Sequence, residues 1–169
     1  MSRVVISDTT AIIHLSRIRA LHLLKDLYGQ LIIPEAVYDE LLRHGHAQPG
    51  ALEVINASWI KVEAVRNPAV VRKLRTGLDL GESEAIALAL EKNADVLIID
   101  EVAGRLEAKK LRLRIIGMVG VLLQAKKEQL IPEIRSYLDA LDRTGFRLGK
   151  DLRDLALRQA GEDVQQRRG

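Results

Sequence analysis

The chain lacks cysteine and has few aromatic side chains. Its 169 residues include no cysteine, one tryptophan, three tyrosines and one phenylalanine. Without thiols the protein has no disulfide framework, no thiolate zinc site and no cysteine nucleophile. So few aromatic rings argue against a sheet that stacks the bases of single-stranded RNA. We therefore expect any bound nucleic acid to be held mainly by its phosphate backbone.

Long apolar runs and two common catalytic motifs are also missing. No apolar stretch approaches roughly 18 residues, and residues 1–7 are not a charged segment leading into a long apolar one. These absences predict a soluble, cytoplasmic protein without a membrane span. The lack of Gly-x-x-x-x-Gly-Lys excludes a P-loop, and the lack of Gly-x-Ser-x-Gly argues against a serine hydrolase.

Positive charge is concentrated in one short stretch. The chain has 26 lysines and arginines against 23 acids, a net charge of +3. Five basic residues lie within ten positions, opposed only by Glu107: Arg105, Lys109, Lys110, Arg112 and Arg114. This cluster predicts a nucleic-acid-binding stripe that contacts phosphates. A helix face exposed to water is the alternative interpretation.

Short aliphatic runs alternate with stretches of helical periodicity. The runs cover residues 4–7, 31–33, 60–63, 96–99 and 114–116. Their alternation with helices indicates βαβ units and a mostly parallel sheet. The runs are nearly all apolar, which is typical of strands with helices on both faces. The predicted fold is therefore a three-layer α/β/α domain.

Prolines, glycines and apolar patterns mark the expected helices. A helix is predicted from Pro34 to about Arg43, and others over residues 82–92, 119–125, 132–142 and 150–161. We expect residues 1–125 to form the core that carries the site. Residues 126–169 should be C-terminal helices packed on the same domain, with a frayed polar end at 162–169.

Two of the predicted strands end in an aspartate. Asp8 follows the first strand and Asp100 follows the fourth. In open α/β sheets, ligands bind outside the carboxyl ends of the strands. If both strands lie near the middle of the sheet, the two carboxylates meet at one edge. Either aspartate alone is equally well explained as the N-cap of the helix that follows it.

Helix phase singles out a third acid, Glu82. At about 100° per residue, Glu82 falls in line with Ala85 and Ala89, whereas Glu84 falls beside Glu91. The projection predicts that Glu82 faces the core and that Glu84 faces water. A favourable interaction with the positive end of the helix dipole would also explain an acid in this first turn.

The fourth acid is Glu40. In the helix that follows Pro34, the apolar residues Val37 and Leu41 define the buried side. Glu40 lies at the edge of that side and Asp39 lies opposite. Glu40 can therefore reach a cleft that Asp39 cannot.

Four carboxylates in one cleft require a cation. Their mutual repulsion raises their pKa values unless a positive charge neutralises them. Oxygen-only ligation favours Mg²⁺ or Mn²⁺ over zinc or copper. Such an ion activates water and stabilises the charge that develops when a phosphodiester is cleaved. His44 and His46 flank a glycine without a third ligand nearby, so we expect no zinc there.

Four segments, in order, resemble the motifs of PIN-domain nucleases. They are Val-Ile-Ser-Asp-Thr-Thr-Ala-Ile-Ile at 5–13, Val-Tyr-Asp-Glu-Leu at 37–41, Gly-Glu-Ser-Glu-Ala-Ile-Ala-Leu-Ala at 81–89 and Leu-Ile-Ile-Asp at 97–100. With Gly104-Arg105 and Ile116-Gly117, the combination is similar to a largely uncharacterised PIN subfamily that has Gly-Glu in its third motif. The likeness covers about residues 3–125.

The resemblance implies a Mg²⁺- or Mn²⁺-dependent endoribonuclease. Asp8, Glu40, Glu82 and Asp100 would be its catalytic acids and metal ligands. It also implies RNA as substrate, a homodimer and frequently a toxin with a cognate antitoxin protein. Many members have aspartate where this chain has Glu82, and serine or threonine where it has Ile98. The first difference changes reach, and the second removes a hydroxyl that can support a ligand.

Neighbouring residues are expected to support the acids. Thr9 and Thr10 can hydrogen-bond a ligand carboxylate or a metal-bound water, or can cap a helix. We expect Glu101 to be a supporting residue near the metal ligands as well. Arg105, one turn past Asp100, can reach a scissile phosphate or form an ion pair with Glu101.

Two other functions remain open from the residues. A phosphatase or receiver that is phosphorylated on Asp8 also places an aspartate after its first strand, but it expects a second acid at the position of Thr10. A PIN-like module that binds nucleic acid or protein without turnover is the other alternative, and Glu82 and Ile98 motivate it.

Overall fold

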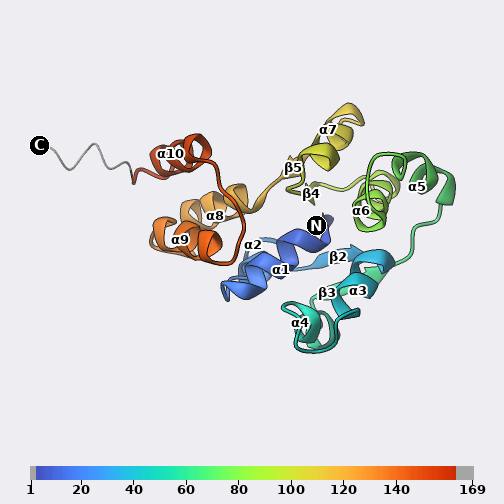
Figure 1. Ribbon diagram of the computed structural model, residues 1–169, viewed down its shortest axis with the longest axis horizontal. Coiled ribbons are helices and arrows are strands. Elements are labelled where there is room, and N and C mark those ends of the chain that lie inside the picture. Colours follow the sequence, from blue (N-terminus) through green and yellow to red (C-terminus); the bar gives the residue numbers. More distant parts are fainter. Residues whose placement is uncertain (1–2, 163–169) are drawn as a thin grey trace, which may run out of the picture.

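Five parallel strands form the centre of the molecule. The computed structural model describes residues 3–162 (Figure 1). The strand order is β3-β2-β1-β4-β5, and every pairing is parallel. The strands are β1 (Val5–Ser7), β2 (Leu31–Pro34), β3 (Ile60–Glu63), β4 (Val96–Ile98) and β5 (Ile115–Ile116). The predicted parallel sheet is confirmed, with the first strand at its middle.

Helices cover both faces of this sheet. One face packs against α1 (Thr9–Arg17), α2 (His22–Tyr28), α8 (Met118–Lys127), α9 (Arg135–Arg143) and α10 (Lys150–Gln159). The other packs against α5 (Pro68–Leu74), α6 (Leu80–Glu91) and α7 (Val102–Lys110). Near β2 and β3 lie α3 (Glu35–Leu42) and α4 (Ala51–Asn56). The three-layer α/β/α architecture is therefore confirmed (Figure 1).

The strands are apolar throughout because each face of the sheet has its own core. In β1, Val5 packs with the cluster of α1 and α8, and Ile6 packs with that of α6. In β4, Ile98 packs with the cluster of α1 and α8, and Leu97 packs with that of α6. All four side chains are completely buried. Burial on both faces removes the alternation of polar and apolar residues that a half-exposed strand shows.

Some helix boundaries differ from those predicted. Pro34 is the last residue of β2 and precedes α3, because its φ suits both extended backbone and the approach to a helix. Pro132 does not open a helix, and α9 begins at Arg135. Of the end predicted at residues 162–169, only Glu162 lies within the described residues. In the described range, no helix is both long and apolar enough to cross a membrane.

Glu162 connects the last described turn to α8 and α9 through hydrogen bonds. Its carboxylate accepts hydrogen bonds from the backbone N–H groups of Ile134 and Arg135, at 2.9 and 3.2 Å, and from Lys126 Nζ at 2.9 Å. Arg135 also donates to the Glu162 carbonyl at 2.7 Å. Burial alone raises the pKa of Glu162, but these donors outweigh it and hold the pKa below the ordinary value.

We predict that Glu162→Ala lowers the free energy of unfolding by about 1–3 kcal/mol at pH 7, because it leaves partly buried donors without their acceptor. The pKa of Glu162 is lower in the folded chain, so its stabilisation exists above the unfolded pKa and is lost as the pH falls through the folded pKa. Urea denaturation of both proteins at pH 7 and in acid measures this. The exposed Glu128→Ala should change stability by less than about 0.5 kcal/mol; equal losses in the two variants would contradict the prediction.

Candidate active site

Asp8 lies at the carboxyl end of the central strand. Its backbone N–H donates to the Ile98 carbonyl at 3.0 Å, which extends the pairing of β1 with β4. One carboxylate oxygen, Oδ1, accepts from the N–H of Ala11 at 3.2 Å and so caps α1. The other oxygen, Oδ2, is buried and accepts no hydrogen bond of ordinary geometry from residues 3–162, although the residue is only 1% exposed. The backbone N–H of Asp100 lies near this carboxylate and partly offsets the rise in its pKa. Capping of α1 therefore uses only one of the two carboxylate oxygens.

Asp100 is held from two sides at the end of β4. The backbone N–H of Met118, the first residue of α8, donates to Oδ1 at 3.1 Å and Oδ2 at 3.2 Å. Arg105 lies beside the carboxylate and donates to the Ile99 carbonyl at 2.9 Å. A Cβ at Gly117 would lie 2.6 Å from Asp100 Oδ1 and 2.9 Å from Arg105 Nη1. Only glycine at 117 leaves room for this arrangement.

Glu82 projects from the first turn of α6 toward α7. Asp79 caps this helix by accepting from the Glu82 N–H at 2.8 Å, so the helix begins two residues earlier than predicted. A Cβ at Gly104 of α7 would meet Ile99 at 2.6 Å and the carboxyl carbon of Glu82 at 3.9 Å. The missing side chain at Gly104 lets α7 approach β4 and brings Glu82 alongside.

Glu40 reaches the same edge from α3. The Thr9 hydroxyl donates to Glu40 Oε2 at 2.9 Å. A Cβ at Gly81 would lie 3.0 Å from that oxygen and 3.3 Å from the Thr9 hydroxyl. Glu40 is half-buried, whereas Asp39 beside it is exposed. Of the two threonines expected near the acids, Thr9 is buried and bonded to Glu40, and Thr10 is half-buried.

The acids raise one another's pKa values. Burial, followed by the charges of Asp100 and Glu82, raises the pKa of Asp8 well above its ordinary value. Burial, with Asp79, Glu101 and Glu40, raises the pKa of Glu82 to about 7. Burial raises the pKa of Asp100 to about 6, against the opposing effects of the Met118 N–H and Arg105. The carboxylates therefore form one electrostatically coupled cluster with too little positive charge.

The cluster includes two acids outside the four predicted ligands. Glu101, expected among the supporting residues, is exposed and precedes α7. Asp79 was not predicted; its place three residues before Glu82, as in a helix N-cap, was the available signal. Within residues 3–162, no three Asp, Glu, His or Cys side chains converge tightly enough to ligate one ion as they stand.

The prediction that Glu84 faces water is wrong. Its carboxylate accepts from the backbone N–H of Ala36 at 3.0 Å and satisfies a donor at the start of α3. Glu91, projected to the same side, accepts from the N–H groups of Arg66 and Asn67 before α5. Because other helices surround α6, both acids serve as acceptors for neighbouring backbones.

Most of the predicted basic stripe lies away from the acids. Arg105 is next to Asp100, and the ion pair expected with Glu101 is not among the salt bridges of the described residues. Lys109 and Lys110 are in the last turn of α7. Arg112 and Arg114 follow and lead into β5, where the Arg114 carbonyl accepts from Leu97. These four residues therefore lie toward the amino ends of the strands, whereas the acids lie at the carboxyl ends.

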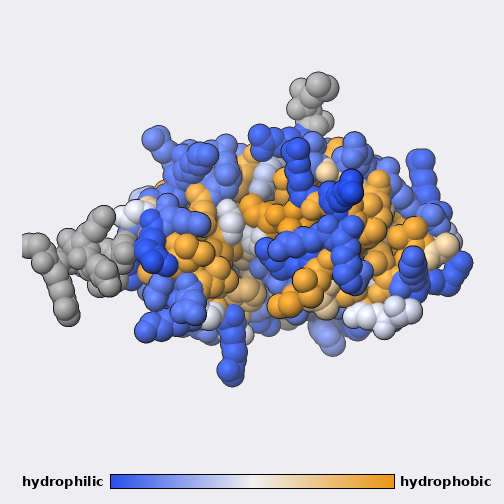
Figure 2. Space-filling model, turned by 90° about the horizontal axis from the view of Figure 1, so that it is seen from above, coloured by the Kyte–Doolittle hydropathy of each residue, from blue (hydrophilic) through white to orange (hydrophobic). Residues whose placement is uncertain are grey.

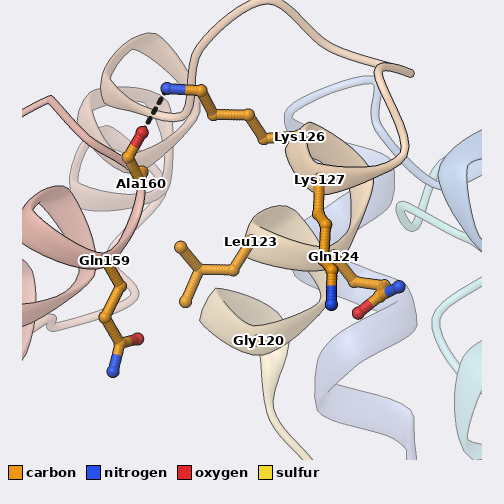
Figure 3. Close-up of a pocket in the computed structure, with 7 residues that line it drawn as sticks. All are labelled: Gly120, Leu123, Gln124, Lys126, Lys127, Gln159 and Ala160. Atoms are coloured by element: carbon orange, nitrogen blue, oxygen red, sulfur yellow. Dashed lines mark hydrogen bonds between the residues drawn. The ribbon is translucent and has the colours of Figure 1, made fainter.

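Several hollows also lie apart from the acids. One of about 440 Å³ separates α8 from α10 (Figure 3). Leu123 points into it, between Lys127 and Gln159. Lys126, at its margin, donates to the Ala160 carbonyl. This pocket contains none of the predicted site residues.

The fold and the acidic edge together define a class. A three-layer parallel α/β domain with aspartates after its first and fourth strands has the architecture of the PIN fold. The family model described as PIN domain matches residues 4–162, and the chain belongs to that family. PIN domains are generally nucleases that typically use divalent metals, so nucleic acid is the substrate class of this fold. No curated protein matches the chain significantly.

We predict that Glu82→Gln stabilises the chain at pH 8 in a metal chelator. The folded-state pKa of about 7 lies above the unfolded value, so ionised Glu82 costs stability above that pH, and the cost disappears as the pH falls toward the unfolded pKa. The variant should therefore have a higher Tm than wild type at pH 8, and nearly the same Tm near pH 4.5. If Glu82 mainly stabilised its helix dipole, the variant would melt lower at pH 8. Asp39→Asn is the exposed control.

Proposed function

We propose that this PIN domain is a Mg²⁺- or Mn²⁺-dependent endoribonuclease. Asp8, Glu82, Asp100 and Glu40 would hold the ion. The observation that carries the proposal is the buried Oδ2 of Asp8, which accepts no hydrogen bond of ordinary geometry within the described part of the chain and lies among carboxylates that raise the pKa of Asp8. A buried acceptor without a donor is costly, and a cation compensates it.

The chemistry of the residues fits such an ion. The donors are all carboxylate oxygens, which hard divalent cations prefer. Asp8 and Asp100 extend from strand ends and have short side chains. Glu40 and Glu82 come from helices and have longer side chains, so they can turn inward from their present separation. When bound, the divalent ion supplies an activated water and positive charge against the phosphodiester.

The residues around the four acids have separate parts in this proposal. The N–H of Met118 orients Asp100, and the hydroxyl of Thr9 orients Glu40, so that both present an oxygen at the edge. Arg105, next to Asp100, supplies positive charge close enough to meet a phosphate. Asp79 and Glu101 add negative charge that favours metal binding.

The test is Mn²⁺-dependent cleavage of single-stranded RNA by wild type and Asp8→Asn. Loss of a residue that hydrogen-bonds a metal ligand typically lowers metal affinity or activity about 10- to 100-fold. Loss of the ligand itself should therefore lower kcat/KM by at least about 100-fold. Calorimetry should show Mn²⁺ binding by wild type and a matching loss in Asp8→Asn. Asp39→Asn, exposed on α3, should retain both properties. Equal cleavage by wild type and Asp8→Asn would refute the proposal.

A binding module without turnover is the second candidate. Ile98 is completely buried and supplies no hydroxyl, whereas its partner across the ladder, Ser7, uses its hydroxyl to bond the Asp8 carbonyl at 3.0 Å. The side chain at position 98 therefore contributes only packing. Failure to bind Mn²⁺ at millimolar concentration, with RNA binding retained, would favour this module over the nuclease.

For the biological role, we propose the toxin of a toxin–antitoxin pair that acts in the cytoplasm as a homodimer. Membership of the PIN family supports this role. Expression of the wild type should arrest growth of a heterologous host, and Asp8→Asn should not. A small protein encoded by a neighbouring reading frame should relieve the arrest if it is the antitoxin; arrest of equal strength by both variants would contradict a nuclease toxin.

A further inference from the structure

Helix α7 exposes an apolar ridge. Val102 is 73% exposed and Leu106, one turn later, is 55% exposed. Figure 2 views the side of the molecule that α7 occupies at the top of Figure 1, where apolar side chains reach the surface between charged ones. Lys109 falls within about 60° of both residues around the helix. The ridge therefore passes from two apolar residues to a basic one.

The two ends of α7 differ in charge. Exposed Glu101 precedes the helix, next to Asp100 and the acidic cluster. Exposed Lys109 and Lys110 end it, and of these two only Lys110 forms a salt bridge with a described residue, Glu107 at 3.1 Å. The nine residues span about 13.5 Å. Within one subunit, these lysines are therefore a helix length away from the acids that they would serve as phosphate contacts.

We propose that two copies of this chain pair through α7, antiparallel about a two-fold axis. Val102 of each copy packs against Leu106 of the partner subunit. This register places Lys109 and Lys110 of the partner subunit past Glu101, beside the acidic cluster. The composite site then has acids from one copy and lysines from the other. Its use of RNA rests on the proposed nuclease function, but the pairing does not.

A second copy fits this surface because the surface is self-complementary. A two-fold interface brings the same patch of each subunit together in reverse direction. The acidic start of one α7 then meets the basic end of the other, twice in each dimer, while a parallel pairing would bring like charges together. The apolar middle is buried in both copies. An interface of one short helix falls below about 1,200 Å², so we expect a weak dimer with micromolar Kd.

Sedimentation equilibrium of the full chain tests the pairing. Wild type should show a monomer–dimer equilibrium, and Leu106→Lys should weaken it at least about 100-fold, since it buries an ammonium opposite Val102. Leu152→Lys, on α10 and similarly exposed at 49%, should leave it unchanged. A monomeric wild type at about 300 µM, or equal weakening by both variants, would overturn the proposal.

Charge reversal tests the antiparallel register. Glu101→Lys should weaken the dimer, and combining it with Lys109→Glu and Lys110→Glu should restore association. In a parallel pair, or in one that does not bring these charges together, the combined variant would associate no better than Glu101→Lys. That result would overturn the register. All three positions are exposed, so each variant should fold, and circular dichroism checks this.

Mixing two inactive variants tests the composite site. Asp8→Asn keeps the lysines, and Lys109→Ala/Lys110→Ala keeps the acids. Half of the dimers in an equal mixture are heterodimers with one complete site, so RNA cleavage should recover to about a quarter of wild type. Lys25→Ala/Lys61→Ala, exposed elsewhere, should stay active alone. No recovery in dimeric mixtures would overturn the composite site; an inactive wild type that still dimerises would refute the nuclease alone.

Discussion

Burial of the Asp8 carboxylate is the constraint on which the rest of this edge depends. Asp8 caps α1 with one oxygen, while the other lies in the core without a hydrogen bond of ordinary geometry from any described residue. Asp100 and Glu82 surround it and raise its pKa further. The fold compensates Asp100 with a helix N-terminus and an arginine, but within residues 3–162 no cation is among the groups that shift the pKa of Asp8. Negative charge at this edge is therefore only partly compensated by the described residues.

Glycines determine how closely the surrounding elements approach this edge. Gly81, Gly104 and Gly117 each stand where a Cβ would press on one of the site's acids or on the strand beside it. Their role is steric and does not require positive φ, since none of the three is among the positive-φ residues. Ordinary backbone conformations thus bring α6, α7 and α8 together over the end of β4.

The sheet and the position of both aspartates could be predicted from the sequence because apolar runs and strand ends are local signals. The role of Glu84 could not, because α6 is buried on nearly every side and helical phase then no longer separates core from solvent. The distance of most of the basic stripe from the acids could not be predicted from the sequence either, because it depends on how α7 packs on the sheet. Arg105, Lys109 and Lys110 lie along α7, and Arg112 and Arg114 follow its end, so the stripe extends away from the acids.

The central position of β1 has a consequence for synthesis on the ribosome. Ser7 pairs with Ile98, so the ladder between β1 and β4 beside Asp8 forms only after more than 90 further residues have been made. Asp100 gains its backbone donor later still, when Met118 emerges. The nascent chain therefore carries Asp8 long before the acidic edge exists, and a truncated product that ends before α8 leaves Asp100 without that donor. A nuclease assembled in this order stays incomplete until translation has passed residue 118.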